Sequence, residues 1–229
     1  MSVLDEEERT IAAKAALKYV EDGMRLGIGS GRTVAKFIEA LSLKIEEEGI
    51  SIRAVPTSVK TEFLCLEHGI PLTTLDETPS LDLDVDGADQ VERDTLNMIK
   101  GGGGALLREK VVASAAEKRI IIIEEGKLAD KLDWKVPIEV LPFALGFCLK
   151  RLREIGTPTV REGTGKLGPV VTDNGNYIVD LDLGTMEDPY KIEEELKKIP
   201  GVLETGLFLD LTDRVIAGKK NGQVEILER

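Results

Sequence analysis

The sequence of 229 residues is poor in the residues that build metal and redox sites. It contains two cysteines, Cys65 and Cys148, and one histidine, His68. The cysteines have neither metal-ligand nor redox spacing and stand among apolar neighbours, so we expect buried free thiols. A single histidine argues strongly against a histidine-based metal site. We predict that the protein uses no metal and no cofactor.

Long apolar runs and a basic surface are also missing. No apolar stretch approaches the roughly 20 residues that cross a bilayer, and the acidic start MSVLDEEERT is unlike the basic start of a signal peptide. We therefore expect a cytoplasmic protein without a membrane partner. The formal net charge of −12 argues against a nucleic-acid partner. A phosphorylated ligand would need a local site of backbone amides, a helix N-terminus and a few basic side chains.

The first part of the chain alternates between predicted strands and helices. Apolar spacing predicts helices over residues 5–21, 34–45, 58–68 and 105–118, and strands over 25–28, 51–55, 70–75, 81–85 and 120–123. The last of these strands is a run of four isoleucines, which is typical of a strand buried on both faces. Such alternation predicts an α/β fold with a mostly parallel sheet covered by helices.

From about Asp133 the order of elements changes. The pattern predicts strands over residues 136–141, 157–161, 177–183 and 202–207, and helices over 143–155 and 189–199. This β-α-β-β-α-β order is that of a ferredoxin-like α+β domain, and the turn DNGN at 173–176 supplies residues that tolerate positive φ. We expect a final hairpin, 214–216 with 224–227, to return to the first sheet. The predicted domains are residues 1–132 with 208–229, and residues 133–207.

The segment GIGSGRT at residues 27–33 joins a predicted strand to a helix. Its glycines let backbone amides approach a phosphate, and the helix dipole favours an anion. The third glycine of a dinucleotide fingerprint would fall on Arg32, and the Gly-Lys-Ser/Thr of a P-loop is missing. We predict a general anion-binding turn, in which Ser30, Arg32 and Thr33 are candidate extra donors. A tight turn without a ligand is the alternative.

The segment DLDVDGAD at residues 82–89 starts like a calcium loop. Position 12 of such a loop would be Arg93 instead of a bidentate glutamate, so we reject a calcium site. The alternating apolar residues instead predict a strand that delivers Asp86 and Asp89 to a cleft, because ligands bind at the carboxyl ends of parallel strands. We expect these two aspartates to contact substrate hydroxyls, with helix capping or turn formation as the alternative. We expect Asp82 and Asp84 to face solvent.

The segment KGGGGALLREK at residues 100–110 places a run of glycines between Lys100 and Glu109. Glycines lose much backbone entropy on folding, so their presence needs a reason. A nest of amides at a helix N-terminus that holds an oxyanion supplies one. We expect Lys100 at the mouth of this nest and Glu109 about two turns into the helix, although a lone glutamate on a helix is more often a solvated surface residue.

Together the three segments suit the isomerisation of a sugar. Moving a carbonyl group between C1 and C2 of an aldose requires one base that shuttles a proton between these carbons, and donors for the enediolate oxygen. A desolvated carboxylate can act as the base, and amides with a lysine can act as the donors. Triosephosphate isomerase divides the chemistry in the same way.

These segments resemble the A-type ribose-5-phosphate isomerase family. The matching blocks run in family order and are GIGSGRT (27–33), DGAD (86–89), KGGGGALLREK (100–110), VTDNGN (171–176) and PGVLETGLF (200–208). The resemblance implies a Rossmann-like catalytic domain, a ferredoxin-like oligomerisation domain, and a homodimer or homotetramer. It also implies interconversion of ribose 5-phosphate and ribulose 5-phosphate in the non-oxidative pentose phosphate pathway.

The resemblance implies roles for single residues as well. Glu109 matches the base, and Lys100 matches the lysine beside the reacting oxygens. Asp86 and Asp89 match the aspartates that hold the sugar and assist ring opening. The residues that match substrate- or phosphate-binding positions are Gly29, Ser30, Gly31, Arg32, Thr33, Gly101, Gly102, Gly103, Gly104 and Lys127. In two departures, Arg32 stands where bacterial members carry serine, which leaves its role open, and Gln90 replaces a glutamate after DGAD.

Two other functions compete with the isomerase. A sugar-phosphate-sensing domain of a transcription regulator shares the general architecture, but it predicts a helix-turn-helix and a basic surface that the sequence lacks. An amino-sugar phosphate deaminase would use an active-site histidine, whereas His68 stands at a predicted helix end. The isomerase is the preferred interpretation.

Overall fold

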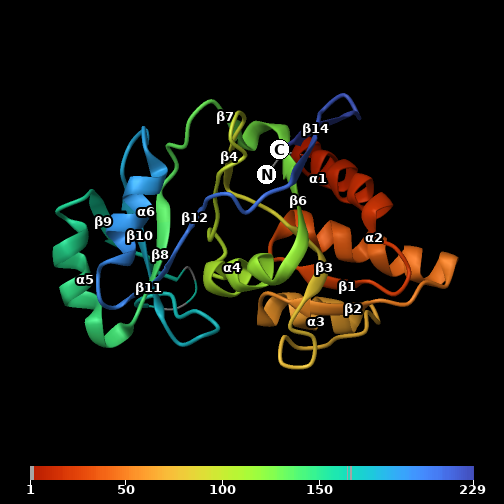
Figure 1. The fold of residues 1–229 in the computed structure, drawn as a ribbon, viewed down its shortest axis with the longest axis horizontal. Helices are drawn as coiled ribbons and strands as arrows, with labels where there is room; N and C mark the ends of the chain where they lie inside the picture. Colours follow the sequence, from red (N-terminus) through yellow and green to blue (C-terminus); the bar gives the residue numbers. More distant parts are fainter. Residues whose placement is uncertain (1–2, 164, 166) are drawn as a thin grey trace. The chain divides into compact units, whose positions relative to one another are not determined.

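The computed structural model describes residues 3–163, 165 and 167–229, which form two compact units (Figure 1). The first unit consists of Met1–Ala88, Arg108–Leu128 and Leu211–Arg229. The second unit consists of Asp89–Leu107 and Ala129–Asp210. Residues 89–107 thus cluster with the second unit, whereas the sequence pattern assigns them to the first domain.

The first unit is built on a six-stranded sheet of order β14-β13-β6-β3-β1-β2. Its strands are β1 (Arg25–Ile28), β2 (Arg53–Pro56), β3 (Leu81–Asp86), β6 (Ala116–Glu124), β13 (Arg214–Gly218) and β14 (Val224–Glu228). All neighbouring strands are parallel except β13 and β14, which form an antiparallel hairpin. The predicted parallel sheet and the return of the C-terminal hairpin to it are both confirmed.

Helices cover both faces of this sheet (Figure 1). They are α1 (Val3–Ala16), α2 (Arg32–Glu48), α3 (Val59–Glu67) and α4 (Leu106–Ala115), with short 3-10 turns η1 (Leu17–Tyr19) and η2 (Glu125–Lys127). Ala12 of α1 and Phe37 of α2 pack with Leu26 on one face, and Val112 of α4 packs with Val55 on the other. Burial of these apolar stripes holds the layers together.

Two predicted elements differ from the structure. Residues 70–75 form a single bridge, Leu72 to Ala54, instead of a strand, and Pro71 within this segment has no N–H to donate. The helix predicted to reach residue 118 ends at Ala115, because residues from Ala116 onward pair with β3 and join β6. Sheet pairing here overrides local helix propensity.

The second unit contains a four-stranded antiparallel sheet of order β11-β8-β10-β9. Its elements are β8 (Val136–Val140), η3 (Pro142–Ala144), α5 (Leu145–Leu152), β9 (Thr157–Val160), β10 (Tyr177–Asp182), α6 (Pro189–Lys197) and β11 (Val202–Thr205). The predicted β-α-β-β-α-β order is confirmed. Ile138 of the sheet packs with Leu152 and Leu196 of the two helices.

A second small sheet explains why residues 89–107 belong to this unit. Its order is β12-β5-β4-β7, with β4 (Gln90–Glu92), β5 (Met98–Ile99), β7 (Leu128–Ala129) and β12 (Leu207–Phe208). Met98 and Ile99 pair with Phe208 and Leu207, so the segment after DGAD is held by the strand that follows β11. The strand predicted over 202–207 is correspondingly split between two sheets.

Candidate active site

In the first unit, the predicted site residues gather at the carboxyl edge of the parallel sheet. The anion turn follows β1, Asp86 ends β3, and Lys127 follows β6. Helix α4 ends where β6 begins, and its Val112 lies over Gly27 in the middle of β1. The helix therefore runs from the carboxyl edge toward the amino edge, which brings its first turn to the same edge as the other residues.

Glu109 lies in that first turn and is buried, with 4% of its surface exposed. Residues 109 and 112 share one helix face, and a Cβ atom on Gly27 would lie 2.4 Å from Cγ1 of Val112, so this face is packed on the sheet. Glu109 is therefore directed toward the sheet, in a position where the helix dipole favours its carboxylate. Its predicted position two turns into the helix is wrong, because α4 begins at Leu106.

Asp86 joins two of the predicted segments. Its Oδ1 atom accepts hydrogen bonds from the amides of Ser30 at 3.0 Å and Gly87 at 2.7 Å, and the residue is 1% exposed. A Cβ atom on Gly29 would lie 1.8 Å from this oxygen, so only glycine fits there. The DGAD segment and the anion turn are thus connected by a carboxylate.

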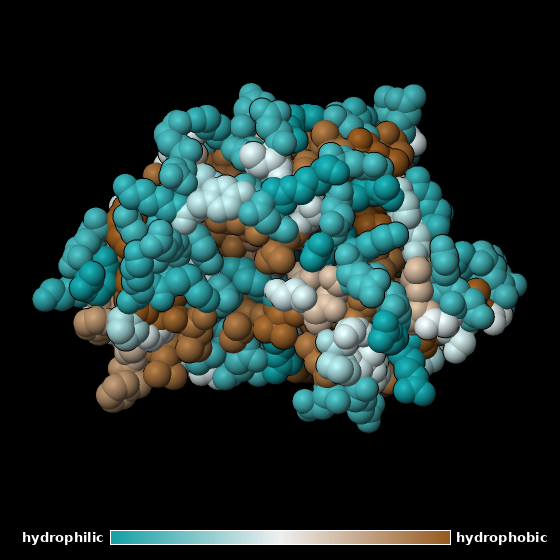
Figure 2. Space-filling model, viewed as in Figure 1, coloured by the Kyte–Doolittle hydropathy of each residue, from teal (hydrophilic) through white to brown (hydrophobic). Residues whose placement is uncertain are grey.

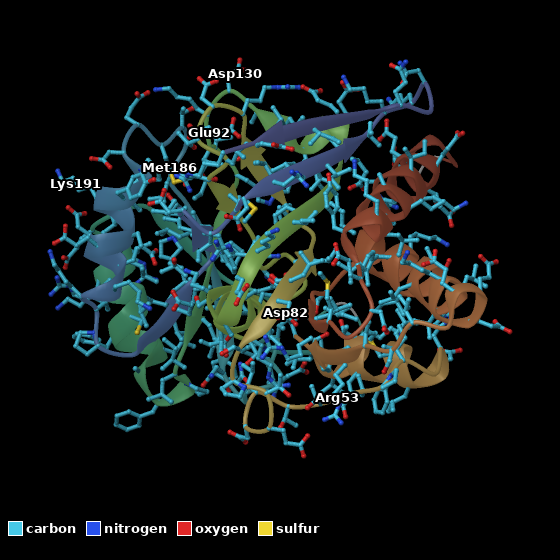
Figure 3. The ribbon with its side chains drawn as sticks, turned by 45° about the vertical axis from the view of Figure 1, so that its right-hand side comes forward. Arg53, Asp82, Glu92, Asp130, Met186 and Lys191 are labelled. Carbon is cyan, nitrogen blue, oxygen red and sulfur yellow. The ribbon has the colours of Figure 1, made fainter. Side chains whose placement is uncertain are left out.

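Of the other two aspartates of β3, which were expected to face solvent, Asp84 is buried and Asp82 is partly exposed. Asp84 is 1% exposed instead of facing solvent. It lies on a central strand under α4, where a Cβ atom on Gly27 would be 2.6 Å from its Oδ1. Asp82, near the start of β3 (Figure 3), is partly exposed and accepts hydrogen bonds from the guanidinium and backbone N–H of Arg25. These hydrogen bonds from Arg25 lower the pKa of Asp82.

The amides of the anion turn divide into two groups. The Gly29 amide donates to the carbonyl of Val85 and the Ser30 amide donates to Asp86, both at 3.0 Å. The next residues open α2, whose first amides have no carbonyl partner within the helix. Thr33 is buried and Arg32 is exposed. The start of α2 is therefore the part of the predicted turn that can offer backbone donors to an anion.

Lys127 contacts the DGAD segment through its ammonium group. Its Nζ donates to the carbonyl of Ala88 at 2.6 Å and lies 3.3 Å from Oε2 of Glu124. Glu124 also accepts from Nε of Arg9 at 2.5 Å. Burial opposes ionisation of Glu124, but Lys127, a backbone hydrogen bond and Arg9 outweigh it, so its pKa is lowered. The predicted phosphate contact of Lys127 stays a prediction.

The second unit contains Asp89, Lys100 and the glycine run. Oδ2 of Asp89 accepts from the amide of Gly102 at 2.6 Å. Lys100 is buried, with its Nζ 5.3 Å from the centre of the Phe208 ring, a cation–π distance. The amide of Gly104 donates to the carbonyl of Gly101 and closes a turn. Gly102 and Gly103 are exposed, as expected for a segment that presents its backbone.

Arg161 is a residue of the second unit that the sequence analysis missed. Its Nη1 donates to the carbonyls of Gly101 at 2.8 Å and Gly102 at 3.1 Å. Its Nε and Nη2 donate to the two carboxylate oxygens of Asp180. Because N–H and C=O point in opposite directions across a trans peptide, this contact turns the amide of Gly103 away from Arg161. No motif marks a single arginine that follows a strand.

A cluster of hydroxyl groups beside the anion turn was also missed. Thr57, Ser58 and Thr61, from the end of β2 and the start of α3, surround Ser30 at hydroxyl oxygen distances of 2.8 to 3.1 Å. Ser58 and Thr61 were predicted only as part of a helix over residues 58–68, and Thr57 lies outside every predicted element. The sequence signal that could have revealed them is a pair of hydroxyl residues, Thr57 and Ser58, directly after β2, the strand that pairs with β1.

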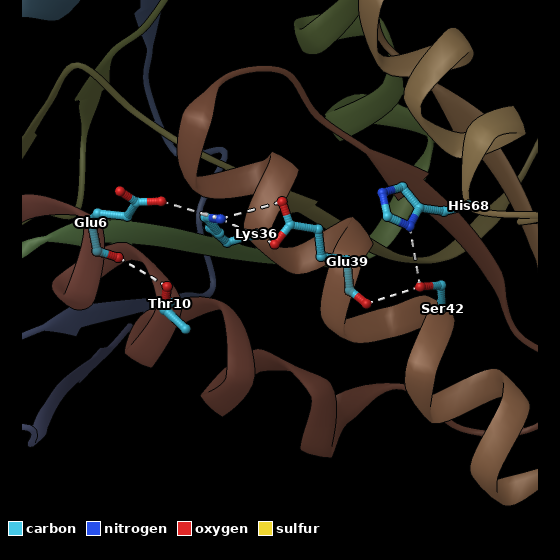
Figure 4. Close-up of polar contacts among 6 residues, drawn as sticks. All are labelled: Glu6, Thr10, Lys36, Glu39, Ser42 and His68. Atoms are coloured by element: carbon cyan, nitrogen blue, oxygen red, sulfur yellow. Dashed lines mark hydrogen bonds and ion pairs between the residues drawn. The ribbon is translucent and has the colours of Figure 1, made fainter.

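His68, Gln90 and the two cysteines were considered in the prediction, and each occupies a structural position. His68 ends α3, and its Nδ1 lies 3.4 Å from Oγ of Ser42 (Figure 4). Gln90 bonds to Asp133 through its side-chain nitrogen and accepts from the amides of Asp133 and Trp134. Both cysteines are free and buried, as predicted.

Two kinds of feature are missing among the residues that the structure describes. Within them, no group of three or more His, Cys, Asp or Glu side chains could hold a metal ion. No helix of this part of the chain has the length and apolar character needed to cross a bilayer.

Comparison with known proteins assigns the family. Residues 53–222 match the model of ribose 5-phosphate isomerase A (phosphoriboisomerase A). A ribose-5-phosphate isomerase A from Archaeoglobus fulgidus is 49% identical over 94% of this chain and 96% of its own. The solved ribose 5-phosphate isomerase A of Methanocaldococcus jannaschii has a TM-score of 0.94 at 41% identity, over 98% of this chain and 100% of its own. A D-ribose-5-phosphate isomerase solved with phospho-erythronic acid has a TM-score of 0.94 at 45% identity, with both chains fully covered. This chain therefore belongs to the ribose 5-phosphate isomerase A family.

Proposed function

We propose that this protein interconverts D-ribose 5-phosphate and D-ribulose 5-phosphate, with Glu109 as the base. The observation that carries the proposal is the position of Glu109, buried in the first turn of α4 at the carboxyl edge of the sheet. This edge also holds Asp86 and the start of α2, which can bind an anion. A carboxylate, an aspartate and a phosphate-sized anion site are the groups that a sugar-phosphate isomerase needs.

In the proposed reaction, the carboxylate of Glu109 takes the proton from C2 of the open-chain aldose. The electron pair of that C–H bond forms the C1=C2 double bond, and negative charge develops on the oxygen of C1. Glu109 then returns the proton to C1 while the hydroxyl on C2 becomes the carbonyl and its proton passes to the oxygen of C1. Lys100 and the glycine amides stabilise the enediolate, and Asp86 and Asp89 hold the sugar hydroxyls.

The relative solved with phospho-erythronic acid supports this proposal. That ligand is a phosphorylated four-carbon sugar acid, so it combines a phosphate with a carboxylate and hydroxyl groups. A protein that binds it needs separate places for an anion and for the oxygen atoms at the other end of a short sugar chain. The anion turn and the residues around Glu109 supply groups of both kinds.

The direct test is conversion of ribose 5-phosphate by the purified chain in the presence of EDTA. We expect rapid formation of ribulose 5-phosphate, with kcat of Glu109→Gln reduced by roughly 10²–10⁴ because the amide cannot accept the proton. The exposed Glu117, just beyond α4, provides the matched control, and Glu117→Gln should keep normal kcat. A wild-type chain that binds ribose 5-phosphate without converting it would overturn the proposed function. Normal turnover by Glu109→Gln would overturn only the assignment of the base.

We further propose a homodimer or homotetramer that associates through the second unit. Phe143 is 96% exposed, and Phe147, one helical turn further, is 49% exposed. Figure 2 shows apolar atoms at the surface in the region of α5, and contiguous exposed apolar surface is typical of an interaction site. Light scattering after gel filtration should give a multiple of 25.0 kDa. Phe143→Glu should reduce that mass, whereas Leu43→Glu on α2 should not, and equal masses for all three proteins would contradict the proposal.

Residence in the cytoplasm is also proposed. Two buried cysteines that remain free suit a reducing compartment. Cell fractionation tests this expectation, and recovery of the protein outside the cytoplasmic fraction would contradict it.

A further inference from the structure

Four hydroxyl groups beside the anion turn form one continuous chain. Oγ1 of Thr57 lies 2.8 Å from Oγ of Ser30, which lies 2.8 Å from Oγ of Ser58. Oγ of Ser58 lies 3.0 Å from Oγ1 of Thr61, which donates to the carbonyl of Gly29 at 2.8 Å. The chain thus begins after β2, crosses to the turn after β1, and returns through the first turn of α3.

The Gly29 carbonyl sets the direction of the protons in this cluster, in which Oγ of Ser30 also lies 3.1 Å from Oγ1 of Thr61. The carbonyl of Gly29 can only accept, so the proton of Thr61 lies between these two groups. The contact between Ser58 and Thr61 must then use the proton of Ser58. By the same reasoning, the proton of Ser30 is donated to Ser58, and that of Thr57 to Ser30. The fifth contact, from Ser30 to Thr61, offers the Ser30 proton a second acceptor within the same cluster, because the Thr61 proton is already donated to Gly29.

This arrangement determines which hydrogen bonds Ser30 can donate. Its hydroxyl proton is donated to Ser58, and its amide proton is donated to Asp86. Thr57 and Thr61 are buried, at 0% and 3% exposed, so water does not readily replace these contacts. Ser30 therefore lies in the anion turn without a proton to offer an anion.

We infer that Thr61 is a positioning residue for anion binding, which acts through Ser58, Ser30 and Gly29, and that Ser30 belongs to this support instead of donating to the phosphate. The anion is bound by the amides at the start of α2, and the hydroxyl chain holds the preceding backbone so that these amides converge. The inference rests on the proposed function in taking the phosphate of a sugar phosphate as the natural anion.

The test compares Thr61→Val with Thr57→Val, two identical changes at buried positions of the chain. Thr61→Val leaves the buried carbonyl of Gly29 without its donor, and we expect the Kd for inorganic phosphate and the KM for ribose 5-phosphate to rise roughly tenfold. Thr57→Val leaves the links from Ser30 to Gly29 in place, and we expect a rise of about threefold or less. Since Glu109 is untouched, kcat should stay within about twofold in both, and Thr61→Ser should restore both constants.

A double-mutant cycle with Ser30→Ala separates support from direct contact. If both residues act through one chain, the double variant should bind inorganic phosphate about as weakly as the weaker single variant. Additive losses, or a Thr61→Val variant that binds phosphate like the wild type, would overturn the inference. If Thr61→Val does not fold, Thr61→Ala removes the same donor to Gly29 and takes its place in the cycle.

Failure of the proposed function gives a different result. A wild-type chain that binds inorganic phosphate without converting ribose 5-phosphate would refute the isomerase. The phosphate constants of the variants would still test the hydroxyl chain. An active isomerase with unchanged phosphate binding in Thr61→Val would refute the hydroxyl chain alone.

Discussion

The amide of Ser30 and Oδ1 of Asp86 are joined by a hydrogen bond of 3.0 Å, although the two residues are 56 positions apart in the chain. The bond connects the turn proposed to bind the phosphate with an aspartate proposed to bind the sugar. Changes at Asp86 should therefore affect both ends of the substrate, and the size of each effect depends on the replacement.

Asp86→Asn keeps an oxygen that can accept from Ser30 and Gly87 but loses the charge. We expect kcat/KM for ribose 5-phosphate to fall about 10- to 100-fold, because a hydrogen bond between a charged group and a substrate hydroxyl is lost. The Kd for inorganic phosphate should change little. Asp86→Ala, which also removes the acceptor for Ser30, should weaken phosphate binding in addition. Equal phosphate binding in the two variants would show that the hydrogen bond does not shape the turn.

Lys100 is proposed to stabilise the enediolate. Lys100→Met keeps an unbranched apolar side chain against Phe208 and removes the ammonium group. We expect kcat to fall by roughly 10²–10³, as for the loss of one oxyanion donor, while the melting temperature stays within a few degrees of that of the wild type. A kcat within a few fold of the wild-type value would place Lys100 in a structural role.

The buried ion pair between Arg9 and Glu124 should make stability depend on pH. The pKa of Glu124 is lower in the folded protein than its ordinary value of 4.5. The carboxylate therefore stabilises the fold above the unfolded pKa, and this stabilisation disappears as the pH falls through the folded pKa. Urea unfolding at pH 7 should show Glu124→Gln less stable by about 3 kcal/mol, since Arg9 loses its buried partner.

The difference between wild type and Glu124→Gln should shrink as the pH falls below 4.5 and through the lowered pKa of Glu124, because the wild-type carboxylate then takes up a proton too. Glu46→Gln, at an exposed position of α2, is the control and should follow the wild-type curve. A difference that is constant over this pH range would show that the charge of Glu124 does not contribute.

Cys65 should be unreactive in the folded protein. Burial raises the pKa of its thiol to about 12, and burial also raises the pKa of the Cys148 thiol. At pH 8 the reactive thiolate of Cys65 is then on the order of 10⁻⁴ of the total. A thiol reagent at pH 8 should detect essentially no thiol in the native protein and both thiols in denaturant. Rapid native labelling that Cys65→Ala abolishes would contradict the burial of this residue.

Much of the fold follows from patterns that sequence alone displays. The strand with four isoleucines lies in the middle of its sheet, and the β-α-β-β-α-β order of the second unit is present. Asp84 shows where this reasoning fails. The alternation of apolar residues and aspartates along β3 predicts that one face of the strand is exposed to solvent. In the structure α4 covers that face, and the packing of α4 on Gly27 is a contact between residues that are distant in the chain. Such tertiary contacts leave no periodic signal.

The residues of the candidate site also fall into those that the sequence predicts and those that it does not. The glycine-rich and aspartate-rich segments are visible because their composition is costly without a purpose. Thr61 and Arg161 carry no such mark, since threonines and arginines are common and these two matter only through carbonyl groups of distant segments. Motifs thus identify groups that are expected to touch the substrate, whereas the residues that hold those groups in place become apparent only in three dimensions.

The pairing of β13 with β6 has a consequence for biosynthesis. Isoleucines 120–123 emerge from the ribosome long before residues 214–218, which cover one edge of their strand. Until then β6 exposes an apolar edge that can pair with other nascent chains. The first unit can complete its sheet only after residues 214–228 have been synthesised, so chains that terminate before β13 should aggregate and be degraded instead of accumulating as a smaller folded enzyme.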